Sequence, residues 1–209
     1  RGDKFTADYV ATGTGPLHVP KLPGIPGLDS FKGHSFHTSR WDYDYTGGSP
    51  DGAPLTKLAD KRVAIIGTGA TAVQAVPHLS ASAGTLYVCQ RTPSSIDARN
   101  NIPIDPDWFA SIAEPGWQYK WLDNFAAWQT GLVMPEVDLV QDGWTDLAKM
   151  MRAKMAQIPP DQLSPESMFA SFENADHEKM EQIRARTDAL VADQDTADKL
   201  KAWYRQLCK

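Results

Sequence analysis

Residues 62–74 read RVAIIGTGATAVQ, and this stretch decides the fold. Arg62–Ile66 is a short apolar run, typical of a parallel strand that is buried on both faces. After Gly67-Thr68-Gly69, apolar residues recur at helical spacing from Ala70 to about Ser82, with a proline inside the helix. A second β-rich run, TLYVC, occupies residues 85–89. The order strand, glycine turn, helix, strand predicts an α/β unit with parallel strands.

The glycine turn fits the pattern G-x-G-x-x-A, with Gly67, Thr68, Gly69, Ala70, Thr71 and Ala72. Between a strand and a helix, this pattern is typical of a dinucleotide site. Gly67 permits the tight turn, Gly69 lets the backbone approach a pyrophosphate, and the small Ala72 lets the helix pack against the strand. The first amides of the helix then face the anion. The alternative is a structural strand–helix turn that binds no ligand.

The end of the second strand indicates which dinucleotide binds. NAD sites usually carry Asp or Glu there to bind the ribose 2′-hydroxyl, whereas this chain has Gln90-Arg91-Thr92-Pro93. Arg91 offers a fork of donors to a 2′-phosphate, and Thr92 adds a hydroxyl. This favours NADP(H) over NAD(H). The alternative for Arg91 is an ordinary exposed arginine.

The composition changes near residue 100. Of the 15 glycines, 12 lie in residues 1–100, and the net charge is +2 in that part against −7 in the rest. After residue 100, apolar residues recur at helical spacing, and the last such stretch runs from Leu200 to Leu207. The predicted fold class is therefore α/β: a partial Rossmann-like NADP-binding domain followed by an α-helical insertion, or cap.

The residues before the first strand fall into three segments with different sequence patterns. Residues 5–12 have the pattern of a strand. Residues 14–30 carry four prolines and predict an extended connector, because proline cannot donate to a sheet or helix ladder. Residues 31–60 show no regular period and predict a long irregular loop, of the kind that is often functional.

Within that loop, residues 31–42 read FKGHSFHTSRWD, which has the form F-x-G-x-x-x-H-x-x-x-W-D. The pattern resembles the signature of Baeyer–Villiger monooxygenases. Three other stretches resemble the same family: Ala11-Thr12-Gly13, where these enzymes pass from the flavin domain to the NADP domain; residues 67–74, with Ala72 where many have Gly; and Gln90–Pro93.

The resemblance implies an FAD- and NADPH-dependent enzyme that inserts one oxygen atom of O₂ next to a ketone carbonyl, giving an ester or lactone. It implies that His37 couples domain movement to the position of the nicotinamide. The implied cofactor contacts are Thr12, Gly13, Gly67, Thr68, Gly69, Ala70, Thr71, Ala72, Gln74, Arg91 and Thr92. Two alternatives are an N- or S-oxidising flavin monooxygenase, against which the signature argues, and a non-catalytic NADP-binding module.

The resemblance also divides the chain. Residues 1–13 would end the FAD domain, 14–60 would link the domains, 61–100 would form the NADP-binding Rossmann segment, and 101–209 would form the helical insertion. The FAD pyrophosphate loop and the arginine that these enzymes place beside the flavin have no counterpart here. We therefore expect an internal segment of a longer protein that is inactive alone.

Composition excludes several other classes. A net charge of −5 argues against nucleic-acid binding, and no apolar run is long enough for a membrane span. Cys89 and Cys208 lie far apart and suggest no disulfide framework, so we expect a cytoplasmic protein. His34 and His37 lack the organised ligand set of a metal site, and none is predicted.

Overall fold

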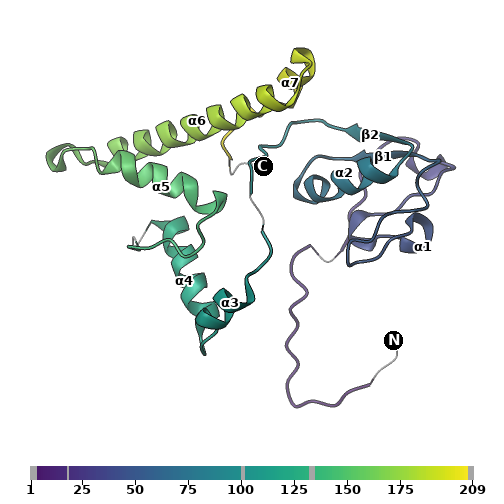
Figure 1. The fold of residues 1–209 in the computed structure, drawn as a ribbon, viewed down its shortest axis with the longest axis horizontal. Coiled ribbons are helices and arrows are strands. Elements are labelled where there is room, and N and C mark those ends of the chain that lie inside the picture. Colours follow the sequence, from purple (N-terminus) through teal and green to yellow (C-terminus); the bar gives the residue numbers. More distant parts are fainter. Residues whose placement is uncertain (1–3, 18, 100–101, 132–134, 207–209) are drawn as a thin grey trace. The chain divides into compact units, whose positions relative to one another are not determined.

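The computed structural model describes residues 4–17, 19–99, 102–131 and 135–206. These residues form helices and one pair of strands, a mixed α/β fold (Figure 1). The chain divides into two compact units. One runs up to Ile65 and includes Gln74–Tyr87, and the other comprises Ile66–Val73 and the described residues from Val88 onward. The strand–helix–strand segment contributes to both units.

The strand–helix–strand segment lies where the sequence predicts it. Its elements are β1 (Arg62–Ile66), α2 (Ala70–Ser82) and β2 (Thr85–Cys89). The amide of Thr85 donates to the carbonyl of Lys61 (3.1 Å), and the amide of Gly67 donates to the carbonyl of Cys89 (2.9 Å). Residue numbers rise together along the two strands, so the strands are parallel, as predicted.

The strands are more exposed than the sequence predicts. Ile65 is the one buried residue of β1, and its neighbour Ile66 is 58% exposed. None of the five residues of β2 is buried. The prediction of a strand buried on both faces is therefore wrong for this structure, because two strands offer too little neighbouring structure to cover both faces of the sheet.

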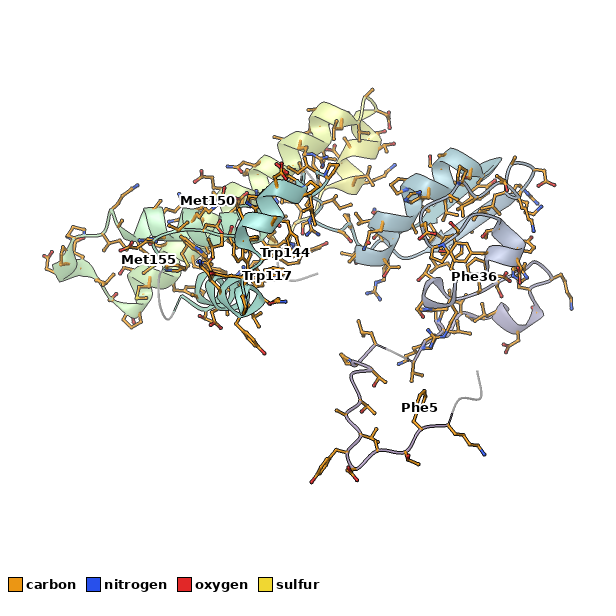
Figure 2. The ribbon with its side chains drawn as sticks, turned by 60° about the horizontal axis from the view of Figure 1, so that its bottom comes forward. Phe5, Phe36, Trp117, Trp144, Met150 and Met155 are labelled. Atoms are coloured by element: carbon orange, nitrogen blue, oxygen red, sulfur yellow. The ribbon has the colours of Figure 1, made fainter. Side chains whose placement is uncertain are left out.

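The residues before β1 are mostly irregular. The strand expected over residues 5–12 does not form, and Phe5 is 90% exposed (Figure 2). An alternating pattern is not sufficient for a strand, because the backbone also needs a partner strand for its hydrogen bonds. The predicted connector and loop contain three short helical turns, η1 (Leu28–Ser30), η2 (Thr38–Arg40) and α1 (Tyr43–Thr46).

The second unit is helical, as predicted. Its elements are α3 (Pro106–Ile112), α4 (Trp117–Thr130), α5 (Gly143–Met155), η3 (Pro160–Gln162), α6 (Pro165–Leu190) and α7 (Gln194–Leu200). A side chain caps the start of α3, α5, α6 and α7, which explains where these helices begin. No described helix is long and apolar enough to cross a membrane.

The helices pack through apolar side chains. Helix α5 lies against α4 and α6, and α6 lies against α7. Met180 and Ile183 on α6 form a buried cluster with Ala202, which Tyr204 covers. At the start of α4, Trp117 makes edge-on contacts with Phe109 and Trp121, at centroid distances of 5.5 and 6.1 Å. Some of the periodic apolar residues of α4 and α6 therefore lie in packing contacts.

The end of the helical series differs from the prediction. The periodic stretch from Leu200 to Leu207 predicts a helix, but α7 ends at Leu200 and Lys201 is extended. Side chains of α6 supply the hydrogen-bond partners instead: Arg184 Nη1 donates to the carbonyl of Ala202 (2.9 Å), and Asp176 accepts from the amide of Gln206 (3.1 Å). Tertiary contacts therefore override the local periodicity here, and Leu207 lies outside the described residues.

Candidate functional site

The glycine turn connects the end of β1 to the start of α2. Gly67 has φ +102°, a backbone conformation that L side chains rarely adopt, which explains glycine at this position. A Cβ built on Gly69 meets no atom within 4 Å, so the space above its backbone is open. Ala72 is buried, as its predicted packing role requires.

Helix α2 begins directly after Gly69. The amide of Val73 donates to the carbonyl of Gly69 at 3.0 Å, and the first-turn amides of Thr71 and Ala72 precede it. A helix has no backbone acceptor for the amides of its first turn, and its dipole favours an anion there. This is the geometry that holds a phosphate group in dinucleotide sites.

Two hydroxyl groups tie the glycine turn to the residues that follow β2. Thr68 Oγ1 donates to the carbonyl of Thr92 at 3.2 Å. In the opposite direction, Ser94 Oγ donates to the carbonyl of Thr68. All three residues are partly buried. We call this pair of hydrogen bonds the Thr68 clamp; it joins two segments that lie about two dozen residues apart in the sequence.

Arg91 stands next to the Thr68 clamp. Its side chain is exposed and makes no hydrogen bond or ion pair with the residues that the structure describes. The chain has no acidic residue from Thr85 to Ser95. The planar guanidinium therefore has its five donors available for an anion such as a phosphate group.

The remaining predicted site residues lie elsewhere on the chain. Thr12 and Gly13 are exposed on the irregular segment before η1, and Gln74 is exposed on α2. His37 precedes η2. The structure therefore brings the glycine turn together with Thr92, which directly follows Arg91. Thr12, Gly13, His37 and Gln74 belong to the first unit.

His37 caps η2 through one ring nitrogen. Its Nδ1 accepts from the amide of Ser39 (3.1 Å) and lies 2.8 Å from the Ser39 hydroxyl. Because Nδ1 acts as an acceptor, the neutral ring carries its proton on Nε2. The ring is thus oriented by the backbone of its own segment and has an Nε2–H group to donate.

His34 and Asp42 hold the other half of the signature segment together. His34 Nε2 lies 2.8 Å from Asp42 Oδ2, and the His34 ring stacks on Tyr45 with a centroid distance of 4.0 Å. The amide of Tyr45 donates to Asp42 Oδ1 (2.9 Å), and this bond together with His34 lowers the pKa of Asp42. Phe36 contacts Trp41 edge-on, with a centroid distance of 5.5 Å.

An open pocket of about 450 Å³ lies within this signature segment. It is lined by residues 34–36 and 40–44. His34 and His37 face different partners, since His34 contacts Asp42 while His37 contacts Ser39. The described residues contain no group of three His, Cys, Asp or Glu side chains arranged for a metal ion.

No protein-family model matches the chain. A curated relative from Streptomyces coelicolor, named Baeyer-Villiger monooxygenase, is 52% identical over 211 residues, covering 100% of this chain and 34% of that protein. The solved structure of polycyclic ketone monooxygenase from Thermothelomyces thermophila aligns with a TM-score of 0.78 and 43% identity, over 94% of this chain and 32% of that one. This chain is a homologue of the Baeyer–Villiger monooxygenases.

A second solved structure extends the comparison to the cofactors. OTEMO, solved in complex with FAD and NADP, aligns with a TM-score of 0.55 and 28% identity over 91% of this chain and 35% of that one. The chain spans about a third of the length of the curated relatives it matches. The relatives that these comparisons find are Baeyer–Villiger monooxygenases, which the signature also resembles, and the roles of individual site residues stay predictions.

The sequence did not point to one part of the site. Ser94 comes two residues after Thr92 and closes the Thr68 clamp. A hydroxyl residue just beyond a strand end is a usable signal, because its side chain can bond to a nearby backbone carbonyl. The carbonyl that it reaches, 26 residues away, cannot be read from local spacing.

Proposed function

We propose that this chain is the NADP-binding segment and helical insertion of a Baeyer–Villiger monooxygenase. The whole protein would use NADPH, FAD and O₂ to insert one oxygen atom next to a ketone carbonyl. The observation that carries the proposal is the Thr68 clamp, which joins a glycine turn suited to a pyrophosphate to the segment that begins with Arg91. A pyrophosphate and a separate 2′-phosphate are the two anionic groups of NADP.

The proposed binding residues divide between these two groups. The backbone from Gly67 to Ala72 would hold the pyrophosphate, because it combines an open approach at Gly69 with first-turn amides. Arg91 and Thr92 would hold the 2′-phosphate, and Arg91 is exposed and has no competing partner among the described residues. Thr12, Gly13 and Gln74 are further proposed cofactor contacts.

The proposed domain organisation follows from the same assignment. Residues 1–13 would close the FAD domain and 14–60 would link it to the NADP domain. The parallel strands would belong to a larger Rossmann-like sheet formed by residues 61–100 and further chain, and residues 101–209 would be its helical insertion. The exposed side chains of β1 and β2 fit strands that have further neighbours in the whole protein.

His37 would position the nicotinamide. Its Nε2–H group can donate to a cofactor carbonyl oxygen, while its Nδ1 stays bonded to Ser39. When bound, NADPH and FAD supply the electron transfer and oxygen activation, and the protein supplies binding and orientation. A ketone and O₂ would be the other substrates, and the location would be cytoplasmic.

The test uses the full-length protein that carries this segment, loaded with FAD. We expect NADPH consumption that requires both O₂ and a cyclic or polycyclic ketone, with the ester or lactone detected by mass spectrometry. Oxidation of an amine or sulfide with no turnover of any ketone would instead support the N- or S-oxidising alternative. NADP⁺ binding without FAD binding or turnover would support the non-catalytic module.

A further inference from the structure

The segment that carries Arg91 is attached to the helical insertion by four polar contacts. The Gln90 side chain donates to the Lys199 carbonyl (2.9 Å), and Ser95 Oγ donates to the Gln206 carbonyl (3.0 Å). The Ile96 carbonyl accepts from Arg186 Nη1 (3.3 Å), and the Asp97 carboxylate pairs with Lys179 Nζ (2.5 Å). All four partners lie on α6, on α7 or just after it. Residues 90–97 are therefore held by the Thr68 clamp at Thr92 and Ser94 and by the insertion at Gln90 and at residues 95–97.

Lys179 is the buried member of these contacts. Its side chain is 7% exposed, and Nζ lies 2.5 Å from Asp97 and 3.3 Å from Asp146. Burial lowers the pKa of Lys179, but the Asp97 carboxylate, aided by Asp146, outweighs burial and raises the pKa overall. The ammonium group is therefore charged, and its shorter bond goes to the Arg91 segment.

We propose that Lys179 is a positioning residue of the cofactor site, which holds Asp97 so that Arg91 faces the 2′-phosphate, and thereby sets the preference for NADPH over NADH. This inference rests on the proposed NADP site. Arg91 has no side-chain contact among the described residues to orient it, so its position depends on how its backbone is held. The Thr68 clamp holds the backbone carbonyl of Thr92, directly after Arg91, and Lys179 holds the side-chain carboxylate of Asp97, six residues after Arg91.

The substitution Lys179→Met tests the proposal because it keeps the aliphatic volume and leaves Asp97 without its counter-ion. In the full-length FAD-loaded protein, we expect NADP⁺ binding to weaken about tenfold, as part of a charged hydrogen bond is lost. NAD⁺ lacks the 2′-phosphate, so its dissociation constant should change less than about twofold. Both constants are measured by fluorescence titration. Lys179→Arg should restore most of the preference.

Two controls separate positioning from general stability. Lys154 on α5 pairs with Glu178 on α6 at 2.7 Å. Glu178 directly precedes Lys179, but this ion pair does not involve residues 90–97. Lys154→Met should leave the ratio of the two dissociation constants unchanged. Asp146→Asn removes the charge of the more distant partner of Lys179 and leaves the ion pair with Asp97 in place. It should therefore also leave the ratio of the two dissociation constants unchanged.

The outcomes distinguish this inference from the proposed function. If Lys179→Met lowers affinity for both cofactors equally, or changes neither, the positioning role is wrong. If that variant does not fold, Asp97→Asn decides in the same way, because Asp97 is more exposed and its loss also breaks the contact. If the unsubstituted protein shows no preference for NADP⁺, or Arg91→Ala leaves the preference intact, the proposed 2′-phosphate site itself fails.

Discussion

Helix α6 buries Met180 and Ile183, whereas the strand pair buries Ile65 but leaves the apolar side chains of Ile66 and Tyr87 exposed. Ile183 on α6 is 4% exposed, whereas Ile66 at the end of β1 is 58% exposed. A helix satisfies its backbone hydrogen bonds internally and needs only a neighbouring helix to cover its apolar face. A strand needs neighbours on its edges and layers on its faces. The helical insertion therefore builds its own core, while the strand pair is shaped mainly by backbone requirements at the glycine turn.

Truncation of a buried and of an exposed isoleucine should change the stability of the chain by very different amounts. Ile183→Ala should destabilise the 209-residue chain by about 2–5 kcal/mol, because it leaves a cavity in the cluster with Met180 and Ala202. Ile66→Ala removes the same atoms from an exposed site and should cost less than about 1 kcal/mol. Urea unfolding of both variants measures the difference. Equal losses would contradict the claim that the two regions differ in packing.

A buried carboxylate gives the helical unit a pH dependence. Asp138 is 9% exposed and accepts from Thr145 Oγ1 (2.5 Å) and from the amides of Val140 and Gln141, with Lys149 at 2.5 Å. Burial alone would raise the pKa of Asp138, but Lys149 and the hydrogen bonds lower it from 3.8 to about 2.

Because the pKa of Asp138 is lower in the folded state, its negative charge contributes its full stabilisation at pH values above the unfolded pKa of 3.8. This contribution disappears as the pH falls through about 2. Asp138→Asn should therefore cost about 2 kcal/mol at pH 7, with the difference shrinking to about half at pH 3. Urea titrations at the two pH values measure it. If the difference in unfolding free energy between the two proteins stays constant with pH, the charge of Asp138 does not stabilise the helical unit.

The glycine turn should separate stability from binding. Gly67→Ala forces a side chain into φ +102° and should destabilise the chain by about 1–2 kcal/mol. Gly69→Ala meets no neighbour within 4 Å and should leave stability unchanged, while its methyl group blocks the approach of a pyrophosphate and weakens NADP⁺ binding. Thermal unfolding and NADP⁺ titration of both variants compare the two effects. Unchanged NADP⁺ binding by Gly69→Ala would contradict the assigned role.

Local pattern was enough to predict the strands, the glycine turn and α2, because each depends on residues within a few positions of one another. The contacts of the site depend on distant residues: Ser94 reaches Thr68, and Lys179 reaches Asp97, 82 residues earlier. The same cause explains the wrong helix after Leu200, where α6 supplies the backbone partners. It also explains the missing strand over residues 5–12, which has no partner strand among the described residues.

Arg91, held beside the glycine turn, is proposed to recognise the 2′-phosphate of NADPH. The most direct measurement is the ratio of NADPH to NADH affinity in the full-length protein before and after Arg91→Ala. Arg99→Ala serves as the control, since Arg99 is also exposed and lies on the same connecting segment, 4.0 Å from Asp142. The ratio should fall about tenfold to a hundredfold for Arg91→Ala, equivalent to about 1.5–3 kcal/mol for a charged hydrogen bond, and stay unchanged for Arg99→Ala. An equal loss of affinity for both cofactors would show that Arg91 does not recognise the 2′-phosphate.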